Sequence, residues 1–278
     1  MLSNQRILIE RSGTVTDSSV DLNEYLSGSV TLSIEADDSI YLGSDLPFNH
    51  RWFEITTANS SASAVSVYLW SGTQWNQAVD VIDQTSVTGK TLAQSGIISW
   101  VPDRQKTWSS QDSTESMDDL SDFKIYDMYW VKITFSGDLH ASSSLLHVGH
   151  KFSSDAQLEA QYPELAQSTL KAAFKTGKTT WNDQTFEAAG YIIQDIKSMR
   201  IARSENQILD WQVFKNASVH KTAEIIFRAF GDDYEDNLVS AMKAYSKAMD
   251  IKFFNIDQNS DARLEPVERQ VSTGWMSR

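Results

Sequence analysis

Near the end of the chain, oxygen-bearing side chains recur at the spacing of a calcium-binding loop. Carboxylate, amide and carbonyl oxygens at these spacings can wrap a hard cation, and a final glutamate can bind it through both oxygens. The spacing therefore predicts an EF-hand-like loop with a structural calcium ion that holds the C-terminal tail for an interface. The residues at its first, third, fifth, seventh, ninth and twelfth positions are Asp257, Asn259, Asp261, Arg263 (through its backbone carbonyl), Glu265 and Glu268.

Two features of this loop argue against a bound cation. The sixth position, where the turn prefers the permissive backbone of glycine, is Ala262. Pro266 and the short tail after Glu268 argue against a second flanking helix. The alternative interpretation, which stays open, is a polar turn that binds no metal.

The other patterns that could carry chemistry are incomplete. Gly89-Lys90-Thr91 and Gly177-Lys178-Thr179 resemble the end of a phosphate-binding loop, but the upstream position that needs glycine holds Gln84 or Ala172. His147 and His150 are three residues apart, which places them on opposite faces of a strand. The sequence has no G-x-S-x-G or H-E-x-x-H motif. We therefore expect that the protein is not an enzyme. A pair of catalytic carboxylates of the glycosidase kind leaves no local motif, because the two residues are brought together only by the fold.

Composition limits the classes further. The chain has 278 residues, 41% of them hydrophobic, which is enough for one large domain or two ordinary ones. It has no cysteine, which excludes disulfides and thiolate metal sites and fits a reducing compartment. We expect no signal peptide and no membrane-spanning segment. The net charge of −13 argues against direct binding to nucleic acid, because phosphate contacts need clustered lysine and arginine.

Residues 1–152 read as an antiparallel β-sandwich. Alternating residues in Val30–Glu35 and in Lys124–Phe135 indicate half-buried strands. The runs 64–70 and 75–82 flank Gly72, which predicts a hairpin. Further strands are expected over 52–57, 97–101 and 145–152.

Aromatic residues are frequent in this first half. Trp70 and Trp75 could belong to a carbohydrate-binding face, but aromatic residues also fill sandwich cores and subunit contacts. We favour the core or interface interpretation.

Residues 153–278 read as a helical bundle domain. Ser153, Ser154 and Asp155 are candidate caps for a short helix that ends before Pro163, and a second helix is expected from Pro163 to about Lys175. Apolar residues at spacings of three and four predict helices over 182–200, 210–230 and 234–249. Gly231 fits the position just after a helix. The expected fold class is therefore α+β, with a sandwich at 1–152 and a helical domain at 153–278.

Several segments resemble a tailed-bacteriophage head–tail connector, or neck adaptor, protein. In the second half they are AAGYIIQDI, ILDWQVFKNASVHKTAEIIFRAFGDDYEDNLVSAMKAYSKAM and IDQNSDARLEPVE. The first half is similar to the β domain of tailed-phage structural proteins through YLGSDLPFNHRWFEI, IISWVPDR, FKIYDMYWVKITFSGDL and GHKFSSDAQLEAQYPEL.

The resemblance implies a virion protein of the neck or tail, assembled in the host cytoplasm. It implies a homo-oligomeric ring, a dodecamer, whose helices contact the portal and whose lumen passes DNA without binding a specific sequence. The β domain would dock neck or tail proteins. The residues expected at the assembly interface are Trp211, Phe214, Phe227, Phe230, Tyr234 and Trp275. The alternatives are a carbohydrate- or receptor-binding phage tail or baseplate protein, and a polysaccharide hydrolase.

Overall fold

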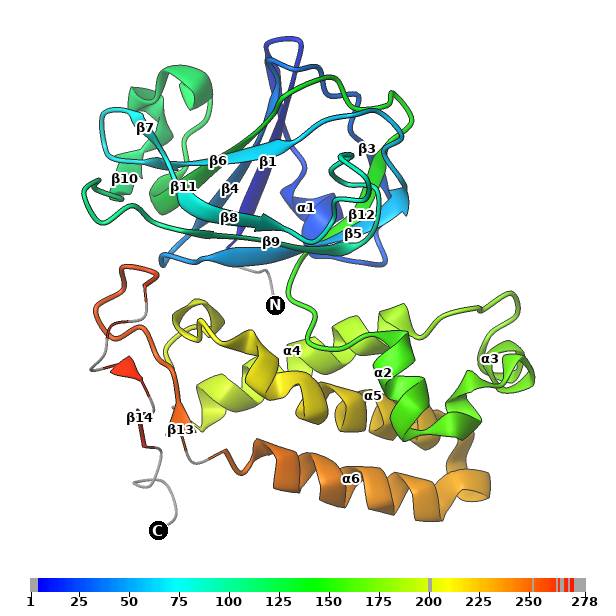
Figure 1. Cartoon of the computed structure of the whole chain (residues 1–278). Helices are drawn as coiled ribbons and strands as arrows, with labels where there is room; N and C mark the ends of the chain where they lie inside the picture. Colours follow the sequence, from blue (N-terminus) through cyan, green and yellow to red (C-terminus); the bar gives the residue numbers. More distant parts are fainter. Residues whose placement is uncertain are drawn as a thin grey trace. The chain divides into compact units, whose positions relative to one another are not determined.

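The computed structural model describes residues 5–199, 202–251, 253–263, 265, 268–269 and 271–272. It confirms the α+β class, with antiparallel sheets in the first half and helices in the second (Figure 1). The chain divides into two compact units. The β unit holds residues 1–149 and Asn259–Arg263, and the helical unit holds His150–Gln258 and the residues from 264 onward.

A seven-stranded antiparallel sheet forms one layer of the β unit, in the order β2-β1-β4-β11-β6-β7, with β10 also paired to β11. Strand β11 is the longest, and it pairs with β4 along most of its length and with β6 over its second half. The strands are β1 (Arg6–Arg11), β2 (Thr14–Asp17), β4 (Ser39–Ser44), β6 (Val65–Trp70), β7 (Trp75–Gln77), β10 (Ser110–Ser113) and β11 (Tyr126–Phe135).

A five-stranded antiparallel sheet in the order β3-β12-β5-β9-β8 forms the second layer. The backbone carbonyls of Thr31 and Leu32 at its β3 end accept hydrogen bonds from the guanidinium of Arg11. This capping protects the β3 edge from pairing with another strand. The strands are β3 (Val30–Thr31), β5 (His50–Thr57), β8 (Val79–Asp83), β9 (Gly96–Val101) and β12 (Ser144–Gly149).

The two sheets enclose a common apolar core. Ile7, Leu42 and Val131 enter it from the seven-stranded sheet, and Phe53 and Ile98 enter it from the five-stranded sheet. All five side chains are completely buried. Burial of alternate residues from both sheets is what defines a β-sandwich, so the predicted architecture of the first half is confirmed.

The opposite face of the seven-stranded sheet carries a smaller apolar cluster. Trp130 of β11 and Tyr41 of β4 pack there with Met117 and Leu120. These last two belong to a segment with two short 3-10 helices, η1 (Thr114–Ser116) and η2 (Asp118–Leu120). The segment therefore covers the aromatic face that β11 turns away from the main core.

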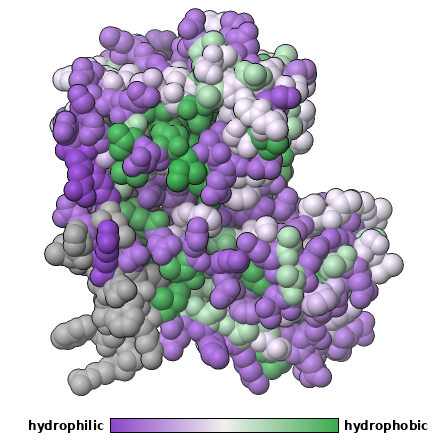
Figure 2. Space-filling model, in the orientation of Figure 1, coloured by the Kyte–Doolittle hydropathy of each residue, from purple (hydrophilic) through white to green (hydrophobic). Residues whose placement is uncertain are grey.

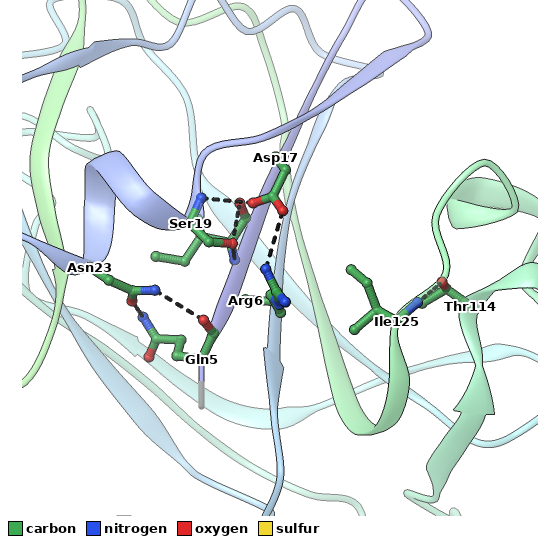
Figure 3. A network of polar contacts seen from close by, with 8 residues as sticks. Gln5, Arg6, Asp17, Ser19, Asn23, Thr114 and Ile125 are labelled. Atoms are coloured by element: carbon green, nitrogen blue, oxygen red, sulfur yellow. Dashed lines mark hydrogen bonds and ion pairs between the residues drawn. The ribbon is translucent and has the colours of Figure 1, made fainter. Parts of the chain in front are cut away.

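A short helix, α1 (Ser19–Asn23), is attached to β1 by polar contacts (Figure 3). The side-chain amides of Gln5 and Asn23 are joined by a hydrogen bond of 3.0 Å, and Asn23 also donates to the Gln5 carbonyl. Asp17 accepts the Ser19 N–H at 2.9 Å, and the Ser19 hydroxyl accepts the N–H of Ile7. The bond from Ser19 to Asp17 satisfies a backbone N–H in the first turn of the helix, where no intrahelical partner exists, and the other bonds tie α1 to the β1 segment.

The helical unit is built around helix α5. Helices α4 and α6 pack on α5, which places it in the middle of the three long helices. A two-stranded ladder of β13 and β14 follows α6. The elements are α2 (Asp155–Gln161), η3 (Pro163–Ala166), α3 (Ser168–Phe174), α4 (Asn182–Ser198), η4 (Glu205–Gln207), η5 (Trp211–Phe214), α5 (Lys215–Phe230), η6 (Gly231–Tyr234), α6 (Glu235–Met249), β13 (Phe253–Phe254) and β14 (Val271–Ser272).

Two apolar clusters stabilise this unit. One contains Ile192 and Ile196 of α4 with Phe152, Phe214 and Tyr245. The second gathers around Trp181, which is fully buried and donates its indole N–H to the carbonyl of Leu165 at 2.8 Å. Helix α5 contributes side chains to both clusters and therefore connects them.

The unit boundary differs from the predicted one in two places. Strand β12 ends at Gly149, and Phe152 already packs on Phe214 with a ring-centre distance of 5.5 Å, so the helical unit begins before residue 153. The segment Asn259–Arg263 belongs to the β unit although it was predicted within the helical domain. Its contacts are described below.

Three predicted elements are shorter than expected. The strand over Val30–Glu35 stops after Thr31, because Ser33 adopts a left-handed φ of 45°. The strand over 75–82 divides into β7 and β8, which belong to different sheets. The helix expected from Pro163 to Lys175 divides into η3 and α3 at Gln167, whose ψ of 124° is extended.

Candidate functional site

The Asp257–Glu268 loop is held in the helical unit by hydrogen bonds at its two ends. The N–H of Asp257 donates to the Gln207 carbonyl at 2.8 Å, and the Asp257 carbonyl accepts from the Gln207 side chain at 3.1 Å. The Glu268 carboxylate is 2% exposed and accepts the backbone N–H groups of Gln258 and Glu265, one at each oxygen. Glu268 thus closes the loop as a hydrogen-bond acceptor.

The middle of the loop lies in the β unit. Asn259 accepts the N–H of Asp261, and Asp261 accepts the N–H of Arg263 at 2.8 Å, so each side chain stabilises a turn two residues long. Ala262 adopts a left-handed φ of 58°, the conformation that glycine would favour at this position. The Arg263 guanidinium donates to the carbonyls of Pro102 and Asp103 in the loop after β9. Arg263 therefore fixes this segment to the β unit through its side chain.

The predicted calcium ligands are divided between the units. Asn259, Asp261 and Arg263 belong to the β unit, and Asp257, Glu265 and Glu268 belong to the helical unit. Among the residues that the structure describes, no three His, Cys, Asp or Glu side chains form a group that could hold a metal. Calcium binding by this loop stays a prediction, and in this conformation the side-chain oxygens of Asn259, Asp261 and Glu268 accept backbone N–H groups.

The predicted interface residues fall into two groups. Phe214 is 1% exposed and Phe227 is 0% exposed, so both pack inside the helical unit. Trp211, Phe230 and Tyr234 are only partly buried and lie at the margins of the two clusters. Trp275 lies outside the described residues. Among the described residues, only Trp211, Phe230 and Tyr234 therefore remain candidates for the predicted interface.

A charged and aromatic network joins α4, α5 and α6. The Lys221 ammonium lies 4.6 Å from the ring centre of Tyr191 and 4.9 Å from that of Tyr245. It also pairs at 3.0 Å with Glu224, whose side chain is 5% exposed and accepts a second bond from Arg228 at 2.6 Å. The spacing of Lys221, Glu224 and Arg228 by three and four residues is the sequence signal that could have found this helix-surface network.

Tyr245 completes the network through its hydroxyl. It donates to the carboxylate of Asp195 on α4. Burial, and then the nearby carboxylates, raise the pKa of the Tyr245 phenol above its ordinary value. The phenol therefore stays protonated and remains a hydrogen-bond donor at any physiological pH.

The tryptophans that could have formed a carbohydrate-binding face are packed against their own unit. Trp70 is 7% exposed and donates its indole N–H to Gln111 at 2.6 Å. Trp75 is half-buried, packs edge-on against Trp70 and donates to Asp119 at 2.7 Å. Lys132 donates to the same Asp119 oxygen at 2.9 Å. Both indoles thus use their polar edge within the protein.

Large apolar side chains are exposed on both units. On the β unit, Val79, Ile82 and Val101 are 41%, 58% and 39% exposed. Figure 2 shows hydrophobic surface over the part of this unit where Figure 1 draws β8 and β9. On the helical unit, Val239 and Met242 of α6 are 41% and 44% exposed. Exposed apolar groups that lie together on a surface are typical of protein contact sites.

Comparison with known proteins gives no assignment. No family model matches the chain, and no curated protein matches it. In the described part of the chain, no helix has both the length and the apolar character needed to cross a membrane.

Proposed function

We propose that the protein is a virion structural component that assembles into a ring between the phage portal and the neck or tail. The observation that carries the proposal is that each unit has its own core and still exposes neighbouring large apolar side chains. Exposed apolar side chains that lie together are typical of contact sites, and a subunit buries such surface on assembly.

The elements that carry the connector resemblance support this function. The resemblance in the second half runs through α4, α5 and α6, which form one packed layer joined by the Lys221 network. The resemblance in the first half runs through β5, β9 and β11, which are strands inside the sandwich. A helical layer that contacts the portal and a sandwich that docks neck or tail proteins is the arrangement that we propose.

The charge of the chain supports a lumen through which DNA slides. With a net charge of −13, a ring of this protein repels the phosphate backbone at short range instead of binding it. Partners in this proposal are further copies of the chain, the portal, and neck or tail proteins. No specific nucleic-acid sequence and no catalytic step are required.

Negative-stain microscopy of the purified chain, alone and mixed with portal assemblies of the same virus, tests the proposal. We expect closed rings with a central hole, and rings stacked on one end of the portal. Single particles of one chain in both samples would contradict it. Binding of such single chains to a glycan array would favour the receptor-binding alternative, and turnover of a polysaccharide would favour the hydrolase.

A further inference from the structure

A buried lysine of the helical unit contacts a side-chain amide. Lys151 precedes α2 and is 5% exposed, and its Nζ donates to Oδ1 of Asn182, the first residue of α4, at 2.8 Å. Both residues belong to the helical unit. Because Oδ1 is bonded to Cγ, the lysine nitrogen lies within about 4 Å of the amide carbon. A nucleophilic atom and a carbonyl carbon are therefore neighbours in a site that is largely removed from water.

A carboxyl group lies beside this pair. Asp155, the first residue of α2, accepts the backbone N–H of Trp181 through Oδ2 at 2.9 Å, and Trp181 directly precedes Asn182 in the chain. The second oxygen of Asp155, Oδ1, is buried and has no hydrogen-bond partner among the described residues. Buried polar atoms normally have a partner, and so this oxygen needs an explanation. Its position makes it available to take up or release a proton next to the lysine and the amide.

The surroundings of Asp155 favour its protonated form. Burial raises the pKa of this carboxyl, the charge of Glu159 acts in the same direction, and the charges of Lys151 and Lys171 oppose both. A carboxyl with a raised pKa accepts a proton from an ammonium group more readily, and removal from water favours an uncharged amine. An uncharged amine is the form of lysine that attacks a carbonyl carbon.

We propose that Lys151 and Asn182 become joined by an isopeptide bond in the folded protein. The ammonium of Lys151 passes a proton to Asp155, and the neutral Nζ forms a bond to Cγ of Asn182. Asp155 gives its proton to Nδ2, the bond between Cγ and Nδ2 breaks, and Nζ loses a second proton to the Asp155 carboxylate. The released ammonia takes up this proton, so Asp155 returns to its starting state and no oxidant or further reactant is consumed. Contact between the two reacting groups supplies the proximity that such a step requires.

Other largely buried lysines of this unit contact carboxylates instead. Lys171 pairs with Glu159 at 2.6 Å, and Lys178 pairs with Asp183 at 3.0 Å. An ionised carboxylate is a poor electrophile, and it has no ammonia to release. The amide that Lys151 contacts is the group that distinguishes it from these two lysines.

The bond connects the segment before α2 to the start of α4. Its two residues are 31 positions apart, so it closes a loop that contains α2, η3 and α3. A covalent loop restricts the unfolded chain in the way that a disulfide does. The chain has no cysteine, and an isopeptide bond, unlike a disulfide, does not depend on the redox conditions. The inference concerns a single chain and is independent of the proposed ring.

Mass spectrometry of the purified, denatured full chain tests the proposal. We expect a mass about 17 Da below that of the sequence, because one ammonia is lost. Trypsin does not cut after a modified lysine, so digestion should give a branched peptide in which residues 133–171 are joined to residues 179–197. A chain with the full mass of its sequence would overturn the proposal.

A lysine variant separates this bond from another reaction with the same mass change. Closure of an asparagine to a succinimide also releases one ammonia, but it forms no branched peptide. Lys151→Arg should restore the full mass, because a guanidinium stays charged and does not attack the amide. Lys171→Arg, at another largely buried lysine, is the matched control and should keep the loss. A loss of about 17 Da that persists in Lys151→Arg would overturn the proposal.

Asp155→Asn tests the proton transfer. The amide oxygen of the variant can still accept the Trp181 N–H, but the amide does not take a proton from an ammonium group. The cross-linked fraction should fall at least about tenfold. Asp183→Asn removes the carboxylate that pairs with Lys178 and should leave the fraction unchanged. Equal fractions in the Asp155→Asn and Asp183→Asn variants would contradict the role of Asp155, and full mass in every chain would contradict the bond itself.

Discussion

The hydroxyl of Tyr245 on α6 donates a hydrogen bond to the carboxylate of Asp195 on α4. Both helices also pack on α5, and Lys221 of α5 lies over the Tyr245 ring. One phenol thus connects all three long helices of the unit that carries the connector resemblance. If this unit supplies the contacts of a ring, its rigidity depends on this connection.

Removal of the Tyr245 hydroxyl should destabilise the helical unit. Tyr245→Phe keeps the ring beneath Lys221 and leaves the Asp195 carboxylate without its donor, which should cost about 1–2 kcal/mol. Chemical denaturation measures the change. Tyr191→Phe is the matched control, because Tyr191 also lies under Lys221 but its side chain is 39% exposed. A loss in the control as large as in Tyr245→Phe would show that the cost does not come from the hydrogen bond to Asp195.

Arg263 should hold the middle of the C-terminal loop on the β unit. Arg263→Ala removes the donors to the Pro102 and Asp103 carbonyls. The amides of Asp261 and Arg263 should then exchange with solvent about tenfold faster, since about 1.4 kcal/mol of local stability corresponds to that factor. Hydrogen exchange measures this. Arg104→Ala removes an exposed arginine of the loop after β9, next to Pro102 and Asp103. It should leave the exchange rates of both amides unchanged.

Glu268 links the structure of the loop to the calcium question. Both of its oxygens accept backbone N–H groups, and so Glu268→Gln should destabilise the loop even in the presence of a chelator. If the loop binds calcium, as its spacing predicts, calcium should raise the melting temperature of the unmodified chain but not that of Glu268→Gln. The same melting temperature of the unmodified chain with calcium and with chelator would favour the polar turn that binds no metal.

His220 should make the helical unit sensitive to acid. Its Nδ1 lies 2.9 Å from the Tyr162 hydroxyl, and burial lowers the pKa of the imidazole below its ordinary value. As the pH falls through about 6.5, the unfolded chain takes up this proton before the folded one, so stability is lost on acidification.

A pair of histidine variants tests this pH dependence. His220→Gln should lose less stability than the unmodified chain between pH 8 and pH 5.5, whereas the exposed His140→Gln should behave like the unmodified chain. Burial also raises the pKa of Asp155, but this contribution is common to all three chains and cancels. Identical pH profiles for all three would contradict a role for His220.

Local sequence signals predicted much of the fold. The Gly72 turn and the Gly231 helix end both adopt positive φ, as expected. Ser154 and Gln157 form the reciprocal capping bonds that start α2. The helix expected over 210–230, by contrast, begins with the 3-10 turn η5, and α5 starts only at Lys215. Each success depends on residues close in sequence.

The sequence did not predict which distant segments of the chain pair with each other. The run 75–82 was expected as one strand, but Ala78 bonds to Val67 in one sheet while β8 pairs with β9 in the other. The periodicity of a strand indicates which residues share a face, but it does not indicate which strand pairs with it. In the same way, the calcium spacing predicted a turn at Asp257–Glu268 but not that Arg263 would bond to residues about 160 positions earlier. The pairing of β8 with β9 and the Lys221 network depend on such distant contacts.

Sedimentation velocity of the purified chain over a wide concentration range tests the central claim most directly. The ring predicts one dominant assembled species, with a mass about twelve times the 31.3 kDa of a single chain and no populated series of open intermediates. A single species of 31.3 kDa at every concentration, unchanged when the portal is added, would contradict it.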